Sequence, residues 1–210
     1  MEKKNIGTIY LPQSCKKYIE TLKLKKFLKF KFFYLENDEN YEFKNASYLT
    51  HLETRTNNIY YKGCIKKLKK IIKAKKVKKK FNILISREQN SRKILNEDSL
   101  FKELKKKNFI KLKFEKLTLA KQIHYCLNSN IIIGYHGSGI INPILFGNDK
   151  THLIEILHSE YNHKMYEKIC KMIKLNYKSF LCTGNKNTLN CFCNIKEIVR
   201  YLEKFTSINK

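Results

Sequence analysis

A histidine and two closely spaced glycines interrupt an apolar stretch in the second half of the chain. The stretch IIIGYHGSGIINPILF covers residues 131–146, with His136, Gly137 and Gly139 in its middle. The pattern predicts a buried strand, a sharp turn that the glycines permit, and a helix whose first backbone N–H groups face the turn. Such a turn can bind a phosphate group, and His136 could donate a hydrogen bond to a phosphate or a sugar. The alternative interpretation is an ordinary strand–helix turn with a partly exposed histidine.

The glycine turn matches neither of two widespread nucleotide-binding motifs. No Gly-Lys-Ser/Thr follows it, as a Walker A motif requires, and its spacing is not G-x-G-x-x-G. Pro143 follows the turn, and because proline lacks a backbone N–H we expect it in the first turn of the helix. This expectation places the start of the helix between Gly139 and Ile141.

Two arginines stand out in a chain whose basic residues are mostly lysine. Arg87 and Arg92 are two of only four arginines, and a guanidinium offers a planar, forked donor that suits a diphosphate. We therefore expect both to bind an anionic ligand. For Arg92 the alternative is a surface ion pair with Glu97 or Asp98, which lie in the first turn of a helix that Asn96 is suited to cap.

One carboxylate lies within the apolar segment LIEIL, which is typical of a buried strand. We expect Glu155 near the end of that strand, where a carboxylate needs a partner. In nucleotide-binding α/β domains such a residue often accepts hydrogen bonds from ribose hydroxyls. A structural ion pair with one of the many lysines is an equally good interpretation.

The seven cysteines form no recognisable site. They are scattered without a C-x-x-C pair or an ordered Cys/His spacing. Free thiols are therefore expected in a chain without a visible export signal. The less favoured alternative is a metal site at Cys182, Cys191 and Cys193.

From Phe81 onward, strand-like segments alternate with helix-like ones. The predicted strands are FNILIS, IKLKFEKL, NIIIGYH, THLIEIL and YKSFLC, and the predicted helices cover residues 96–106, 118–127, 138–146, 161–173 and 195–205. This alternation predicts βαβ units and a parallel sheet. Residues 81–210 should therefore form one Rossmann-like α/β domain, in which ligands bind beyond the carboxyl ends of the strands.

The first 80 residues are less regular. Residues 1–61 predict a strand at TIYLP, a helix from about Ser14 to Leu28, and strands at KFKFFYL and ASYLTHL, which is α/β material too short for a full domain. Residues 62–80 are rich in lysine, with apolar residues at helical spacing, and predict a basic linker helix. The alternative is a segment that contacts a membrane surface or a nucleic acid.

The net charge of +26 at pH 7 is extreme. Such a charge suits a nucleic-acid binder or a protein at an anionic membrane. Lysine, asparagine and isoleucine all have AT-rich codons, however, and lysines fall in nearly every segment, so we favour compositional drift and regard nucleic acid as an unlikely partner. No apolar run reaches the ~20 residues of a transmembrane helix. With no apolar signal peptide at the N-terminus, these features predict a cytoplasmic protein, with peripheral membrane contact compatible.

Taken in order, these motifs resemble the glycosyltransferase 61 family. The resemblance rests on ILISREQNSRKILNEDSL, LTLAKQIHYCLNSNIIIGYHGSGIINPILF and HLIEI, within residues 81 to about 180. The family's pattern is a strand ending in Ser-Arg, an Arg and an Asn-Glu before a helix, a Gln in the next helix, Gly-x-His-Gly-Ala-Gly-Leu-x-Asn, and a strand ending in Glu. The matching positions are Ser86, Arg87, Arg92, Asn96, Glu97, Gln122, Gly134, His136, Gly137, Gly139, Asn142 and Glu155. Ser138 and Ile140 replace the family's usual Ala and Leu.

The resemblance implies a two-domain GT-B architecture, with a Rossmann-like C-terminal domain that holds a nucleotide sugar. It implies inverting transfer of the sugar to an acceptor hydroxyl of a glycan or glycoconjugate, with no obligatory metal and no cofactor. Residues 1–61 would then be a remnant of the N-terminal domain, joined by the linker at 62–80. The residues implied in donor binding are Arg87, Arg92, His136, Gly137, Ser138, Gly139, Asn142 and Glu155.

The resemblance also implies that much of the N-terminal domain, which usually supplies the acceptor site and the general base, is missing. The sequence identifies no catalytic base, because His51, Glu53 and His136 are candidates without geometric support. The chain could be a minimal enzyme, a fragment completed by a partner chain, or an inactive nucleotide-sugar-binding protein. A nucleic-acid binder is a weaker alternative, and so is a methyltransferase, whose glycine loop would be expected after the first strand.

Overall fold

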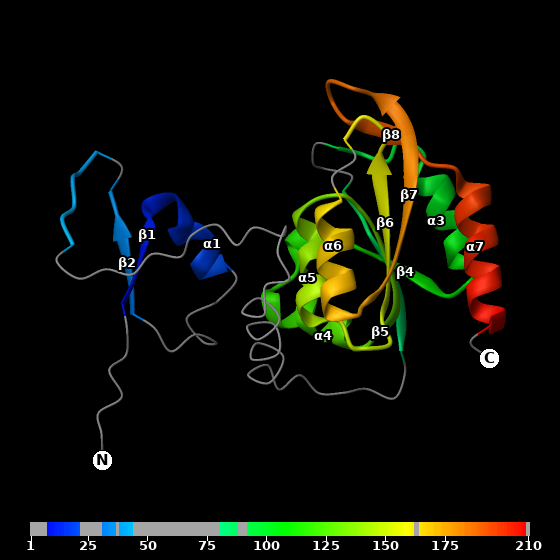
Figure 1. Cartoon of the computed structure of the whole chain (residues 1–210), viewed down its shortest axis with the longest axis horizontal. Coiled ribbons are helices and arrows are strands. Elements are labelled where there is room, and N and C mark those ends of the chain that lie inside the picture. Colours follow the sequence, from blue (N-terminus) through cyan, green and yellow to red (C-terminus); the bar gives the residue numbers. More distant parts are fainter. Residues whose placement is uncertain are drawn as a thin grey trace, which may run out of the picture.

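The computed structural model of the chain describes residues 8–21, 31–36, 38–43, 80–87, 92–161 and 164–208. Figure 1 shows these residues in colour, from the N-terminal elements in blue to the last helix in red. The predicted strand ASYLTHL and almost all of the predicted basic helix at residues 62–80 lie outside the described residues.

From Phe81 onward, the described residues build a six-stranded sheet in the order β4-β3-β5-β6-β7-β8. The first five strands of this order run parallel, and β8 pairs antiparallel with β7. The strands are β3 (Phe81–Ile85), β4 (Phe109–Leu112), β5 (Ser129–Tyr135), β6 (His152–His158), β7 (Asn176–Asn185) and β8 (Asn190–Phe192). The α/β fold with a mostly parallel sheet that the sequence predicts is thereby confirmed.

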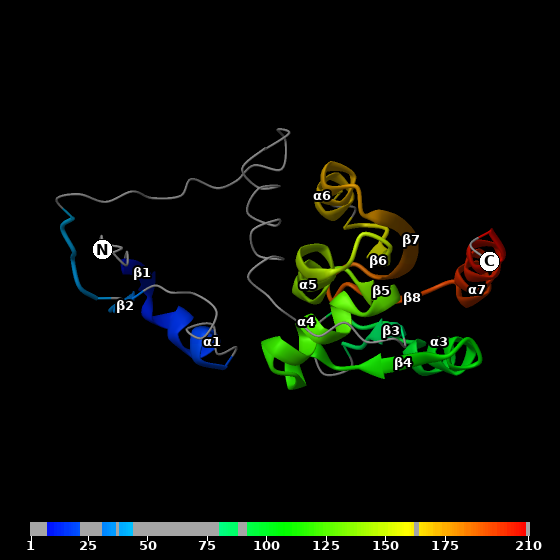
Figure 2. The same cartoon turned by 90° about the horizontal axis from the view of Figure 1, so that it is seen from below.

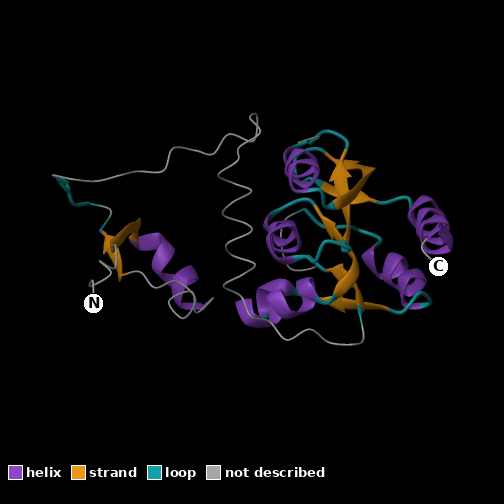
Figure 3. Ribbon diagram, turned by 60° about the horizontal axis from the view of Figure 1, so that its bottom comes forward, coloured by secondary structure: helices purple, strands orange, loops and turns teal. Residues whose placement is uncertain are grey.

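Helices cover both faces of the sheet, as Figures 2 and 3 show from two directions. One face carries α4 (Leu119–Leu127), α5 (Ser138–Phe146) and α6 (Met165–Ile173), and the other carries α3 (Glu97–Lys105) and α7 (Ile195–Ile208). The predicted N-cap of α4 is confirmed, because the Thr118 side chain accepts a hydrogen bond from the backbone N–H of Lys121 at 3.4 Å.

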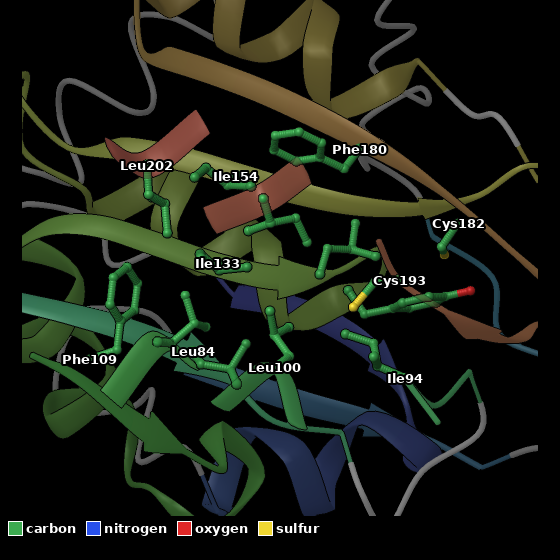
Figure 4. Close-up of a cluster of buried hydrophobic side chains, with 14 of the residues drawn as sticks. Leu84, Ile94, Leu100, Phe109, Ile133, Ile154, Phe180, Cys182, Cys193 and Leu202 are labelled. Carbon is green, nitrogen blue, oxygen red and sulfur yellow. The ribbon is translucent and has the colours of Figure 1, made fainter. Parts of the chain in front are cut away.

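Two hydrophobic cores explain why the central strands are apolar throughout. Ile131 and Ile133 of β5 belong to the core under α3 and α7, whereas Ile132 belongs to the core under α4, α5 and α6. Both faces of these strands are therefore buried, which is the condition of a parallel strand covered by helices. Figure 4 shows the first of these cores, in which Leu84, Ile133 and Ile154 from three adjacent strands lie between the flanking helices.

The strand order creates a place where a ligand can bind. From β3 the chain crosses to β4 on one side, and from β4 it returns to β5 on the other side of β3. At such a switch point the connections after the two central strands diverge, and a crevice opens beyond their carboxyl ends. The residues that follow β3 and β5 are therefore the ones to inspect.

The N-terminal elements form a small βαβ unit. β1 (Thr8–Pro12) pairs in parallel with β2 (Lys31–Leu35), and the described part of their connection contains the short 3-10 helix η1 (Gln13–Cys15) and α1 (Lys16–Thr21). Both predicted strands are confirmed. The predicted helix from Ser14 to Leu28 is confirmed only to Thr21, since the next nine residues lie outside the described part.

Two local predictions are wrong, and one strand was not predicted. Helix α5 begins at Ser138, so Pro143 lies inside it, at the sixth position and not in the first turn. The strand predicted at IKLKFEKL ends at Leu112, and the 3-10 helix η3 (Phe114–Lys116) follows because Phe114 turns into the core. The sequence reading also missed β8, whose three residues are too few to show a strand pattern.

The cysteines also differ from expectation. Cys182 of β7 and Cys191 of β8 form a disulfide, with their Cα atoms 5.8 Å apart. The prediction of free thiols is therefore wrong for this pair, which joins the antiparallel hairpin that the sequence reading missed. Cys193 is free, and its sulfur lies 3.4 Å from the side-chain oxygen of Asn96. In the described ranges, no group of three potential ligands could hold a metal ion, and no helix has the length and apolarity needed to span a membrane.

Candidate functional site

Arg87 and the glycine turn meet at the switch point. Arg87 follows β3, and its Nη1 donates a hydrogen bond to the backbone carbonyl of His136, which follows β5, at 2.7 Å. Gly137 has φ +147°, a conformation that L side chains rarely adopt. A Cβ built on Gly137 would overlap Nη1 of Arg87. The backbone conformation therefore requires the glycine, and a side chain here would also displace the flexible end of Arg87.

Glu97 holds the segment that carries Arg87. The hydroxyl of Ser86, which is fully buried, donates to Oε1 of Glu97 at 2.6 Å. The backbone N–H of Arg87 points at Oε2 of the same carboxylate, at 3.4 Å. Because Glu97 lies in the first turn of α3, it stabilises that helix end and at the same time fixes the chain as it leaves β3. The carboxylate thus orients the backbone of Arg87 without neutralising its guanidinium.

Arg92 brings a second guanidinium to the same region. It has a positive φ of 64°, and its Cζ lies 4.9 Å from the centroid of the Tyr161 ring. The pKa of Arg87 is lowered from its ordinary value, first by burial and then by the charge of Arg92. Neither arginine forms an ion pair with a carboxylate anywhere in the part of the chain that the structure describes. The expected alternative, an ion pair of Arg92 with Glu97 or Asp98, is not observed, since Lys111 contacts both acids.

Strand β8 holds the loop that carries Arg92. The backbone N–H of Lys93 donates to the side-chain oxygen of Asn190 at 2.7 Å, and the N–H of Cys191 donates to the carbonyl of Lys93 at 2.9 Å. Asn96 occupies the N-cap position of α3, but its side chain makes no capping bond; it pairs with the backbone N–H and carbonyl of Cys193. The prediction that the Asn96 side chain caps the helix is therefore wrong, because that side chain bonds the backbone of Cys193, just after β8.

The amino end of α5 adds backbone donors beside the arginines. Gly137 is the N-cap residue, and its carbonyl accepts from the N–H of Ile140 at 3.0 Å and from the Tyr166 hydroxyl at 3.1 Å. The N–H groups of Ser138 and Gly139 open the helix, where the helix dipole favours an anion. A Cβ on Gly139 would meet Cγ2 of Ile85 at 3.4 Å, an ordinary contact. Of the two glycines, Gly137 is thus the one whose lack of a side chain is essential.

His136 takes part in a buried chain of hydrogen bonds. Its Nδ1 lies 2.5 Å from Oε1 of Glu155, and Oε2 of Glu155 accepts a hydrogen bond from the Tyr177 hydroxyl. His136 is 5% exposed and Glu155 is 0% exposed. The His136 ring also contacts the rings of Tyr161 and Tyr166, with centroids 5.3 and 5.0 Å away. The structure therefore gives the geometry of His136 that the sequence did not: its imidazole lies at the carboxyl end of β5 and is hydrogen-bonded to a carboxylate.

Two predicted site residues lie elsewhere than expected. Glu155 is the fourth residue of the seven-residue strand β6, not its end, and its carboxylate is occupied by His136 and Tyr177. Asn142 donates its amide to the side-chain oxygen of Gln122, whose own amide donates to the carbonyls of Phe114 and Leu117. Asn142 therefore ties α5 to α4 in this structure. The other base candidates, His51 and Glu53, lie outside the described residues.

Three tyrosines at the site were missed by the sequence reading. Tyr161 stands between His136 and Arg92, Tyr166 bonds the carbonyl of Gly137, and Tyr177 bonds Glu155. Tyrosine is abundant in this chain, with 13 copies, so residue type alone gave no signal. The one available hint was position, because Tyr177 opens the strand predicted next to that of Glu155.

Comparison with known proteins identifies the family. The profile described as Glycosyltransferase 61 matches residues 8–154, more than half of the chain. The chain belongs to the glycosyltransferase 61 family. The matched range includes the N-terminal βαβ unit and the glycine turn, and it ends within β6. No curated protein matches the chain. Membership in the glycosyltransferase 61 family implies glycosyltransferase activity, and it gives the cluster of arginines, glycines and His136 a chemical context.

Proposed function

We propose that this glycosyltransferase 61 protein transfers a sugar from a nucleotide-diphosphate donor to a hydroxyl of a glycan or glycoconjugate. The diphosphate would bind at the switch point, between Arg87, Arg92 and the amino end of α5. The observation that carries the proposal is the charge there: two guanidiniums lie close together, and neither forms an ion pair with a carboxylate among the described residues, although the charge of Glu115 acts on Arg87. A site of this kind is stabilised when a dianion occupies it.

The proposal includes inverting transfer, and the same arrangement supports a reaction that does not depend on a metal ion. When the bond between sugar and diphosphate breaks, negative charge grows on the leaving oxygen. Guanidiniums, helix N–H groups and His136 can stabilise that charge, which is the role that a metal ion has in other transferases. In this proposal Arg87, Arg92, His136, Gly137, Ser138 and Gly139 contact the donor, whereas Asn142 and Glu155 act through the residues they hold.

The domain organisation follows as part of the proposal. Residues 81–210 would form the nucleotide-sugar domain of a GT-B arrangement, and residues 1–61 would belong to the domain that faces the acceptor, with residues 62–80 between them. A cytoplasmic location with peripheral membrane contact remains a proposal. The Cys182–Cys191 disulfide is an observation against it, because structural disulfides are rare in reducing compartments.

The test is release of nucleoside diphosphate from a panel of nucleotide sugars, with and without a chelator and in the presence of simple glycosides as acceptors. We expect release with one donor class, unchanged by the chelator, and lost in Arg87→Ala. Binding of a nucleotide sugar without any release would support a non-catalytic binder. Release that requires added divalent metal would contradict the proposed mechanism, and an unaltered rate in Arg87→Ala would contradict the proposed site.

A further inference from the structure

Hydrogen bonds connect Tyr177, Glu155 and His136 in series. Which atom donates in each bond determines which nitrogen of the His136 ring can face a ligand. We propose that Glu155 and Tyr177 are positioning residues that keep a proton on Nδ1 of His136 and leave Nε2 as the atom that donates to the diphosphate. This proposal rests on the proposed function for its ligand, but not for the state of the histidine in the free protein.

The carboxylate of Glu155 can only accept hydrogen bonds. It lies in the middle of β6 and is 0% exposed, so both of its oxygens need donors from the protein. Oε2 has the Tyr177 hydroxyl, and Oε1 has Nδ1 of His136 at 2.5 Å. No lysine reaches Glu155 within the described ranges, although lysine is the commonest charged residue of the chain. The donor at Nδ1 must therefore be the imidazole N–H.

Tyr177 stays a donor over the whole working range of pH. Its pKa is raised well above the ordinary value, first by burial and then by its hydrogen bond to the Glu155 carboxylate. The Cys170 thiol also lies near the Glu155 carboxylate. Its pKa is raised to about 12 by burial, with a smaller contribution from the charge of Glu155. Among the described residues, the ionisable groups around the His136–Glu155 pair are Arg87, Arg92, Tyr161, Tyr166, Cys170 and Tyr177. None of them competes with Glu155 for the proton of Nδ1.

The ring of His136 is held in place while its second nitrogen stays available. Tyr161 and Tyr166 pack against the ring, and Arg87 bonds the backbone carbonyl of the same residue at 2.7 Å. In the described part of the chain, Nδ1 is the ring atom that has a hydrogen-bond partner. When Nε2 also carries a proton, the ring becomes a cation whose charge Glu155 balances, and Nε2–H can donate to a phosphate oxygen. His136 then acts together with the two arginines, and the buried imidazolium–carboxylate pair is neutral as a whole.

Nitrogen NMR of the full chain labelled with ¹⁵N-histidine tests the proposal. The His136 signals are assigned by their loss in His136→Gln, and inorganic pyrophosphate is the probe. We expect Nδ1 of His136 to be protonated in the free protein and Nε2 to shift on titration with pyrophosphate. The signals of His152, which lies in an aromatic stack with Tyr201 and Phe205, should not move. That histidine is the internal control.

Two variants separate the contributions. In Glu155→Gln the amide can donate to Nδ1, so we expect the Nε2–H tautomer of His136 to appear. Because the ring then loses the carboxylate that balances its positive charge, Nε2–H becomes a neutral donor and pyrophosphate affinity should fall about tenfold, roughly the difference between a charge-assisted and a neutral hydrogen bond. In Tyr177→Phe the carboxylate remains, so Nδ1 should stay protonated and affinity should fall less than in Glu155→Gln. If Glu155→Gln does not fold, the parent spectrum and Tyr177→Phe still decide the matter.

The possible failures are distinguishable. An Nε2–H tautomer in the free parent protein, or a spectrum that Glu155→Gln leaves unchanged, would overturn the positioning role. A spectrum with Nδ1 protonated, but with no histidine signal shifted by pyrophosphate, would support the positioning of Nδ1 and contradict both the proposed donor site and the assignment of Nε2 to it.

Discussion

His136 and His152 are both buried in the same parallel sheet, but their surroundings differ. His136 follows β5 at the carboxyl edge of the sheet and bonds the Glu155 carboxylate. His152 begins β6 at the opposite edge, stacks on Phe205 with centroids 4.2 Å apart, and bonds the Tyr201 hydroxyl at 2.9 Å through Nε2. Its Nδ1 is buried and has no hydrogen-bond partner among the described residues. At the carboxyl edge the histidine thus has a carboxylate partner in addition to aromatic neighbours, whereas at the amino edge it has aromatic neighbours and a hydroxyl partner.

The difference teaches where this fold can bind an ion. Burial lowers the pKa of His152 to about 4, because desolvation disfavours the charged imidazolium. At the carboxyl edge, a carboxylate, two guanidiniums and a helix end lie together. In a protein with a charge of +26, the proposed anion site rests on this local arrangement and not on the sum of lysines.

The largest effect should come from filling the space beside Arg87. Gly137→Val places a branched side chain where the Arg87 guanidinium now lies and forces a non-glycine residue to φ +147°. We expect stability to fall by about 1–3 kcal/mol from backbone strain, together with loss of nucleotide binding because Arg87 is displaced. Chemical denaturation and calorimetric titration measure the two effects.

The matched control for Gly137→Val is Gly139→Ala, two residues away. A Cβ there meets Ile85 at an ordinary 3.4 Å, so binding and stability should stay close to the parent values. If Gly139→Ala were as damaging as Gly137→Val, the essential role assigned to Gly137 would be wrong.

A smaller effect is expected when the guanidinium of Arg87 is replaced by an ammonium group, which keeps the positive charge but lacks the planar pair of N–H donors. In Arg87→Lys the ammonium cannot bond the His136 carbonyl and a phosphate in the same planar geometry. We expect affinity for the nucleotide donor to fall roughly tenfold, about the contribution of one charge-assisted hydrogen bond. Calorimetric titration at fixed salt is the measurement, and an unchanged affinity would mean that only positive charge matters at this position.

The contribution of His152, at the amino edge of the sheet, to folding stability should depend on pH, and substituting it should not change ligand binding. Because the pKa of His152 is depressed in the folded chain from 6.5 to about 4, the unfolded chain binds more protons between those values. Its contribution to stability is complete above pH 6.5 and is lost as the pH falls toward 4. His152→Phe should reduce this loss while leaving nucleotide binding unaltered, as urea denaturation between pH 7 and 4.5 would show. Equal acid sensitivity in parent and variant would contradict the role assigned to burial of His152.

Much of the fold could be predicted because its patterns are local. The apolar run around Ile132 predicted a strand buried on both faces, and Thr118 marked the start of α4 correctly. Strand β8 has only three residues, and the backbone of Cys191 in it bonds Lys93 and Leu95, which are distant in sequence. No local sequence pattern therefore predicted this strand. Pro143 was misplaced because helix α5 tolerates it in the second turn, close to the end of the helix.

The site could be predicted in its residues but not in its connections. Arg87, His136 and Gly137 were identified from residue type and from a family resemblance, and the structure brings them together. That Glu155 serves His136 depends on the register of two strands, in which Gly134 pairs with Glu155. Register is a tertiary property, and the sequence alone does not give it. For the same reason Tyr177, one strand further, was missed.

The most direct measurement is thermal stability against a panel of nucleoside diphosphates and nucleotide sugars at moderate salt. A ligand at about 100 times its dissociation constant should stabilise the parent protein by about 2.7 kcal/mol. The matched variants are Arg87→Ala and Arg200→Ala, which remove the same charge, the first at the site and the second from the exposed surface of α7. We predict stabilisation by one donor class that persists in Arg200→Ala and is abolished in Arg87→Ala. Equal stabilisation of both variants, or equal stabilisation by every polyanion including inorganic phosphate, would contradict a specific diphosphate site at the carboxyl edge of the sheet.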